Sequence, residues 1–230
     1  MGQSIIYDNI AISFETDSLA NELKITKRPQ LVKSLNDMTS QLVTLARPKA
    51  LAVPVAPIIN NGASLSIEGF EFQSNVLKIN LEQANNIFAV LVTAGKEADT
   101  WIRSFDDILF QYWADHLVDN ILRQSINYLE EEIRTKYNLS TLSWMTPGSL
   151  EEWPISEQEK LFGIFGENAL RLDVSLTDNF IMQPLKSLSG VMFDSTDLFF
   201  SCQLCDKSKC EKRRAEYDLR LARQKYGLKS

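Results

Sequence analysis

The chain has 230 residues, of which 44% are hydrophobic and 23% charged, so it can bury a sizeable core and is not of the disordered class. Its formal net charge of −6 at pH 7 argues against general nucleic-acid binding. No run approaches the roughly 18 apolar residues that a membrane span needs, and the first residues lack the basic start and apolar stretch of a secretory signal. We therefore expect a cytoplasmic protein with no membrane partner.

The first part of the chain is predicted to contain two helices and a series of short strands. A strand is expected over residues 5–14, followed by a short helix over 17–23. Pro29 opens a longer helix over 31–45, whose apolar residues recur at helical spacing. Prolines and alternating apolar positions then predict extended segments over residues 50–67, 68–72 and 76–79, with a short helix over 81–85.

Two strong patterns follow in the middle of the chain. The run NIFAVLVTA, residues 86–94, is apolar almost throughout and predicts a buried central strand. After a helix over 96–104, residues 106–136 place apolar side chains three to five positions apart, which predicts a long amphipathic helix against the core. This apolar stripe consists of Leu109, Trp113, Leu117, Ile121, Ile126, Leu129 and Ile133.

The remaining sequence predicts turns, one more helix and short strands. Residues 138–154 are rich in turn formers, and Ser156 with Glu159 has the spacing of a capping box for a helix that ends near Phe165. Extended segments are expected over residues 172–176, 180–182, 188–193 and 198–202, and a charged helix over 209–224. No linker or internal repeat divides the chain, so we expect one α+β domain over residues 1–230, a twisted antiparallel sheet wrapped by helices.

The C-terminal tail, residues 202–230, differs from the rest of the chain in charge. From Asp206 to Ser230 it holds nine basic and four acidic residues, a net charge of +5, which leaves −11 on the body. Such a tail can meet an acidic partner, an anion or RNA. The alternative is an ordinary solvated C-terminal helix.

All three cysteines lie in this tail. Cys202, Cys205 and Cys210 form the pattern C-x2-C-x4-C, which is not the framework of a secreted disulfide protein. Two thiolates on one tight turn with a third nearby are typical of zinc sites and iron–sulfur clusters, and Asp206 is a candidate for a fourth ligand. The alternative is three reduced thiols that pack as small hydrophobic groups.

Two stretches match the pattern of a known family. The first is Pro147-Gly148, followed by Trp153-Pro154 and the helix after them. The second is LTDNFIMQPLKSLSGVMF, residues 176–193, which is similar to the family's Leu-Thr-Glu-Ser, then Met, Pro and Ser-Val-Ser-Gly before a strand. With the long helix they cover roughly residues 88–193, and this part of the chain resembles the activation domain of cobalamin-dependent methionine synthase.

The resemblance implies a function and a partner. In the family, the domain binds S-adenosylmethionine beside the corrinoid (vitamin B12) of a partner domain, and methyl transfer rescues enzyme whose cobalt has been oxidised. The chain is therefore expected to be an accessory protein of corrinoid-dependent methyl transfer. It would act on a corrinoid protein or corrinoid methyltransferase by reductive reactivation or methylation.

Two other functions remain open. The chain would be a non-catalytic module if it only recognises a corrinoid protein, without the activity of a methyltransferase or a redox activator. A regulatory protein that uses a metal and places its basic tail on nucleic acid is the third hypothesis, and its binding would fall steeply with salt.

The resemblance also assigns candidate site residues. They are Trp144, Pro147, Gly148 and Ser149 in the loop, and Ser189, Gly190 and Met192 in the following strand. The family's loop reads Arg-x-x-x-Gly-Tyr, but Trp144 stands in place of the arginine, Ser149 in place of the tyrosine, and Met192 in place of a further tyrosine. An arginine holds a carboxylate through two charge-assisted hydrogen bonds, whereas an indole offers one donor and no charge. The departures imply weak or absent S-adenosylmethionine binding.

One more set of residues in these segments has two interpretations. Trp144, Met145, Trp153 and Met182 can form an apolar surface for a corrinoid-bearing partner, since aromatic residues and methionine are favoured in contact patches. The alternative is that they belong to the core.

Overall fold

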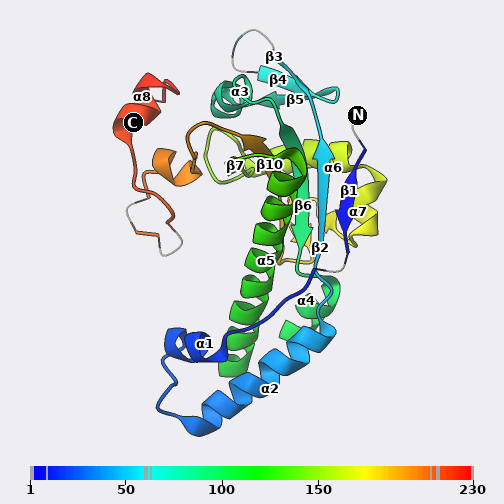
Figure 1. The fold of residues 1–230 in the computed structure, drawn as a ribbon, viewed down its shortest axis with the longest axis vertical. Coiled ribbons are helices and arrows are strands. Elements are labelled where there is room, and N and C mark those ends of the chain that lie inside the picture. The colour runs from blue at the N-terminus through cyan, green and yellow to red at the C-terminus, as the bar shows by residue number, and fades with distance from the viewer. Residues whose placement is uncertain are drawn as a thin grey trace.

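A computed structural model gives the structure of residues 3–8, 10–59, 62, 64–207, 209–210 and 213–228. It is an α+β fold in which a five-stranded antiparallel sheet has helices on both faces, as predicted (Figure 1). The strands are β1 (Ile5–Tyr7), β2 (Lys49–Pro54), β6 (Ile87–Thr93), β10 (Ser187–Asp194) and β7 (Leu142–Met145), in that spatial order. Among the helices of the described residues, none combines the length and the low polarity that crossing a bilayer requires.

The centre of the sheet is β6, the strand predicted from the apolar run. All seven of its residues are buried, because β2 and β10 pair with its two edges and both of its faces are covered. Its side chains alternate between the faces: Val90 and Val92 belong to one cluster of the core, and Ala89 and Leu91 to another. A strand buried in this way has no polar face, which explains the continuous apolar sequence.

One face of the sheet is covered by α5 (Ile108–Tyr137), the long helix predicted from its apolar stripe. The Asp107 side chain caps its first turn by accepting from the backbone N–H of Leu109 at 2.8 Å, and Asn138 ends it in the left-handed conformation. Ile126, Leu129 and Ile133 in its second half pack on the sheet. Its first half extends past the sheet, where α1 (Thr16–Glu22), α2 (Pro29–Leu45) and α4 (Lys96–Ile102) form a helical end (Figure 1).

The other face carries the largest cluster of the core. It is covered by α3 (Asn75–Leu81), α6 (Gln158–Phe165), α7 (Glu167–Arg171) and the small sheet of β3 (Pro57–Ile59), β4 (Ser64–Ile67) and β5 (Phe70–Gln73). Trp153, fully buried, packs in this cluster against Phe72 with the ring centroids 6.4 Å apart. A hairpin of β8 (Ser175–Leu176) and β9 (Met182–Gln183) leads into β10.

Several local predictions are wrong, and each has a structural reason. Residues 76–79 lie in α3 rather than in a strand, because the Ser74 hydroxyl caps a helix there through the N–H of Leu77. Ser156 is not a helix cap but lies inside the 3₁₀ turn η1 (Ile155–Glu157). Residues 198–202 do not form a strand and lead into a second 3₁₀ turn, η2 (Ser201–Leu204).

Two further differences concern element lengths at the C-terminal side. The segment read as turns contains an edge strand, β7, which was missed because four residues carry too little alternation to be recognised. Of the charged helix predicted over residues 209–224, only α8 (Leu219–Gln224) is helical within the described part of the tail. Of the predicted helix before Asp218, the described residues 209–210 and 213–217 are not helical, and side-chain contacts of Arg213 that helical propensity does not anticipate hold this part of the chain.

Candidate functional site

The C-terminal tail folds back onto the sheet and becomes part of the core. Just before the tail begins, the N–H of Phe199 donates to the Ser143 hydroxyl of β7 at 2.7 Å. Near its end Tyr226 is 1% exposed, and its hydroxyl donates to Oδ1 of Asn80 in α3 at 2.7 Å. The tail is thus docked at both ends, while most charged side chains of α8 stay exposed.

Between these two anchors, Arg213 closes the tail into a loop. Its guanidinium donates to the carbonyl oxygens of Cys202 at 3.1 Å, Cys205 at 3.1 Å and Ala215 at 3.2 Å, and also to that of Lys207. Four backbone acceptors around one cation fix the path of the chain on both sides of it. The loop therefore holds its neighbouring residues in defined positions against β7.

The three cysteines lie around this loop in different environments. Cys202 is half-buried and its sulfur accepts from the N–H of Arg214 at 3.4 Å, Cys205 is half-buried against the core, and Cys210 is exposed. No group of three or more His, Cys, Asp or Glu side chains within the described residues is arranged to hold a metal ion. The structure does not assemble the predicted metal site, and a metal at these cysteines stays a prediction.

The tail and the predicted ligand loop meet at a small pocket. Its volume is about 150 Å³, and it lies where β7 and the following loop face residues 200–202 and Arg214. The residues that line it are Trp144, Thr146, Ser149, Phe200, Ser201, Cys202 and Arg214. Two stretches that the sequence singled out for separate reasons, the family loop and the cysteine tail, therefore contribute to one site.

Arg214 is the charged group of this pocket. The central carbon of its guanidinium lies over the Trp144 ring, 5.4 Å from the ring centroid, and over the Phe200 ring at 4.9 Å. Both distances are within the range of favourable cation–π contacts. Beside them the Ser149 hydroxyl donates to the carbonyl of Thr146 at 2.7 Å and lies 3.3 Å from the Ser201 hydroxyl.

Pro147 and Gly148 shape the loop but do not line the pocket. The N–H of Gly148 donates to the carbonyl of Trp153 at 2.7 Å, which closes the turn. Its φ of +82° is a conformation that side chains rarely adopt, and an added Cβ would lie 3.2 Å from the Cβ of Ile155. The glycine is therefore required by the backbone of the turn.

The three candidate residues on β10 lie in the sheet rather than in the pocket. Met192 is buried directly opposite Trp144 in the β10–β7 register. The Ser189 hydroxyl donates to Oε1 of Gln158 in α6 at 2.8 Å, and Gly190 lies against the backbone of Met145. The structure thus brings Trp144 and Ser149 together at the pocket and separates Ser189, Gly190 and Met192 from it.

The apolar residues of the same segments divide between core and surface. Trp153 and Met145 are fully buried, so for these two the core interpretation holds. Trp144 and Met182 are partly buried, and each packs on one cluster of the core. Only these two retain exposed surface that a partner could contact.

The pKa of Glu130, a carboxylate on α5, is influenced by burial and by the charge of Arg214. Burial raises the pKa of Glu130, and the guanidinium groups of Arg134 and Arg214 lower it in part. Glu130 makes no ion pair with Arg214 among the pairs of the described residues, so the two charges interact only at longer range. Within the part of the chain that the structure describes, Arg214 is thus not neutralised by a direct carboxylate partner.

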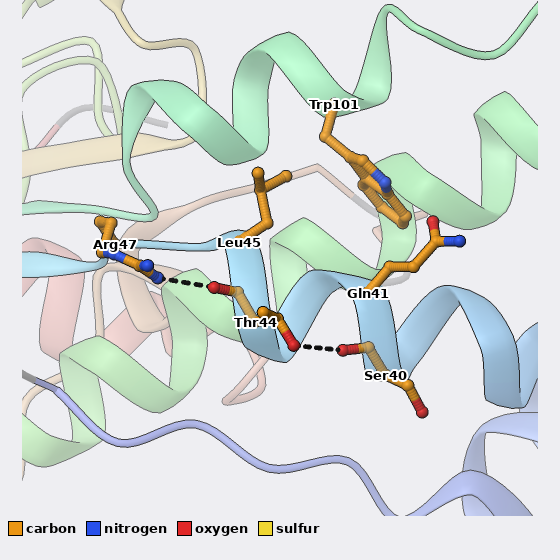
Figure 2. Close-up of a pocket in the computed structure, with 6 residues that line it drawn as sticks. All are labelled: Ser40, Gln41, Thr44, Leu45, Arg47 and Trp101. Atoms are coloured by element: carbon orange, nitrogen blue, oxygen red, sulfur yellow. Dashed lines mark hydrogen bonds between the residues drawn. The ribbon is translucent and has the colours of Figure 1, made fainter.

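A larger pocket, of about 610 Å³, lies at the helical end between α2 and α4 (Figure 2). The charged side chain that lines this pocket is Arg47, and its guanidinium donates to the carbonyls of Thr44 at 2.9 Å and Ala46 at 2.8 Å, which caps the end of α2. Trp101 forms its wall and is nearly buried. The residues predicted from the sequence lie elsewhere, and we do not take this hollow as the functional site.

The fold has a solved counterpart. No protein-family model matches the chain, and no curated protein matches it significantly. The solved MetH reactivation domain bound to AdoHcy is similar to it, with a TM-score of 0.64 over 86% of this chain and 80% of that one. The chain has a methionine synthase activation domain-like fold. At 17% sequence identity the likeness concerns the fold alone, and it confirms the fold that the two sequence stretches predicted.

The sequence did not identify Phe200, Ser201 and Arg214 as site residues. The only signal was the basic character of the tail, which pointed to an anion without saying which residue would meet it. Their position depends on the tail docking on β7, a contact between segments far apart in the chain.

Proposed function

We propose that this chain is an accessory protein of corrinoid-dependent methyl transfer, which binds a corrinoid protein and assists the reactivation of its cobalt. The observation that carries the proposal is the match in fold, over 86% of the chain, to a domain whose solved structure is named for reactivation. The matching Leu176–Phe193 segment and Pro-Gly loop support it from the sequence.

The residues of the pocket do not fit a whole S-adenosylmethionine or AdoHcy molecule. Pockets that enclose ligands of that size measure about 300–1,000 Å³, whereas this one measures about 150 Å³. Arg214 of the tail lies over Trp144, where the resemblance places the ligand loop, and Phe200 lines the same pocket. We therefore favour the version in which the chain recognises a corrinoid protein without supplying the methyl group.

The test uses the full chain and the cobalamin-binding part of a methionine synthase as the probe. Sedimentation of the mixture is expected to show a complex with the cobalamin-loaded probe that is weaker with the cobalamin-free form. With a reductant and S-adenosylmethionine present, the visible spectrum then reports whether methylcobalamin forms. Absence of any complex with the loaded probe would refute the proposal.

Calorimetry with S-adenosylmethionine separates the two versions of the function. No heat of binding is expected from the chain alone, because the pocket is too small and the loop lacks its arginine. Binding together with methylcobalamin formation would instead establish the methylating version. Metal and acid-labile sulfide, measured on protein purified without oxygen, would show whether the tail cysteines add an iron–sulfur or zinc centre.

A further inference from the structure

We propose that the pocket between β7 and the tail binds a small carboxylate, and that Arg214 is the residue that recognises it. The ligand class is a short or aromatic carboxylic acid whose apolar body fits beside the two rings. This goes beyond the proposed function, because it concerns a ligand of the chain itself and needs no corrinoid partner.

The Arg214 guanidinium lies over two aromatic rings. The rings are those of Trp144 and Phe200, and none of the hydrogen bonds within the described residues uses the N–H groups of the guanidinium. The neighbouring Arg213 behaves in the opposite way, since it donates to four carbonyl oxygens. A guanidinium that lies near aromatic rings and makes none of these hydrogen bonds keeps its planar fork of donors, the shape that matches a carboxylate.

Arg214 is held in position by its surroundings. Arg213 fixes the chain on one side, and the N–H of Arg214 itself donates to the sulfur of Cys202. Beyond it, Asp218 donates its N–H to the carbonyl of Gln203 at 2.8 Å, and Tyr226 anchors the end of the tail. A binding group that is placed before the ligand arrives loses less freedom on binding.

The size and chemistry of the pocket suit a small carboxylate. A volume of about 150 Å³ is that of a cavity known to take benzene. The indole of Trp144, the phenyl ring of Phe200 and the thiol of Cys202 make most of its wall apolar. The hydroxyls of Ser149 and Ser201 interact with each other. One guanidinium in an apolar pocket suits a single carboxylate on an apolar body.

A carboxylate is favoured over a phosphate for a structural reason. Phosphate sites usually collect several cations or a group of backbone N–H donors at a helix N-terminus. Arg214 is the only charged side chain among the described residues that line this pocket. The planar pair of oxygens in a carboxylate is sufficient to satisfy one fork, whereas the additional oxygens of a phosphate would face apolar walls.

The test compares benzoate with benzamide, which has the same shape without the charge, by calorimetry and NMR titration on the full chain. Charge-assisted hydrogen bonds are worth about ten- to hundredfold in affinity, and we expect benzoate to bind more tightly than benzamide by such a factor. Arg214→Gln should lower the affinity for benzoate to the affinity for benzamide. The matched control is Arg220→Gln, which removes the same charge from exposed α8 and should leave binding unchanged.

Several outcomes would overturn the proposal. They are equal binding of benzoate and benzamide, unchanged benzoate affinity in Arg214→Gln, absence of benzoate binding, or inorganic phosphate binding as tightly as benzoate. Arg214 is exposed, so its substitution should not unfold the chain, and melting temperatures check this. Arg214→Lys, which keeps the charge but loses the fork, should bind benzoate with intermediate affinity. The comparison of the two ligands on the unaltered chain decides the matter even if a variant misfolds.

Discussion

Replacing Tyr226 by phenylalanine tests whether the tail is docked as the structure has it. The substitution removes one oxygen and keeps the ring, which packs in the core near Phe199 with the centroids 5.8 Å apart. The hydroxyl donates to Oδ1 of Asn80 at 2.7 Å, and Tyr226 and Asn80 are only 1% and 7% exposed. The variant therefore leaves a buried acceptor without its donor.

The expected loss follows from this geometry. A buried polar group that loses its partner costs about 1–3 kcal/mol of the free energy of unfolding. The same change at Tyr217, which is 38% exposed, should matter by less than about 0.5 kcal/mol and serves as the control.

A second effect appears at alkaline pH. Burial raises the pKa of Tyr226 from its usual 10.0 to about 12. A group whose pKa is higher in the folded state contributes stability below its unfolded pKa and loses it as the pH rises through the folded pKa. Between pH 9 and pH 11 the unaltered chain should therefore lose about 1.4 kcal/mol through this residue. Tyr226→Phe should not show this part of the decline.

The assay is urea unfolding followed by circular dichroism at pH 7, 9 and 11 for both proteins and the Tyr217→Phe control. The difference between the curves isolates Tyr226 from other residues that titrate, such as Tyr7, whose pKa burial also raises. Equal stability of Tyr226→Phe and the unaltered chain at pH 7, with parallel declines toward pH 11, would refute a buried Tyr226. The result would also remove one of the contacts from which the fixed position of Arg214 was inferred.

Two other predictions concern the sheet and the cysteines. Gly190→Ala should destabilise the chain by about 1–3 kcal/mol in urea unfolding, because the new Cβ would lie 2.4 Å from the backbone oxygen of Met145. Gly163→Ala should lose less, since its Cβ meets only the tip of the Phe70 side chain and alanine favours a helix; a larger loss at Gly163 would contradict the reasoning. Replacing Cys202, Cys205 and Cys210 together by serine should shift the melting temperature little, because these thiols are half-buried or exposed. A collapse of stability with loss of bound zinc or iron would instead establish the predicted metal site.

Much of the architecture could be predicted from local patterns. The apolar run at residues 86–94 predicted the central strand β6, and the stripe from Leu109 to Ile133 predicted α5. A strand buried on both faces leaves a continuous apolar run bounded by turn residues, and a helix buried on one face leaves an apolar stripe at helical spacing that persists over many turns. The sequence also predicted the fold through the residues around Pro147 and Leu176, and the solved counterpart agrees.

Short elements were less predictable because their conformation depends on contacts outside the segment. Residues 76–79 alternate like a strand, yet a single cap at Ser74 and burial against β4 make them helical. Strand β7 is four residues long and exists because β10 pairs with it. In such cases the tertiary partner outweighs local propensity.

The sequence by itself determined the α+β class, the central strand, the long helix and the altered family loop at Trp144 and Ser149. Only the tertiary structure decided that Met192 is a core residue and that Arg214 lies over Trp144. The reason is physical: periodicity reports which face of an element is buried, but not which distant segment buries it. The tail meets β7 where Arg214 lies over Trp144, and the contacts of Arg213 and Tyr226 hold the tail in that position only once the chain has folded.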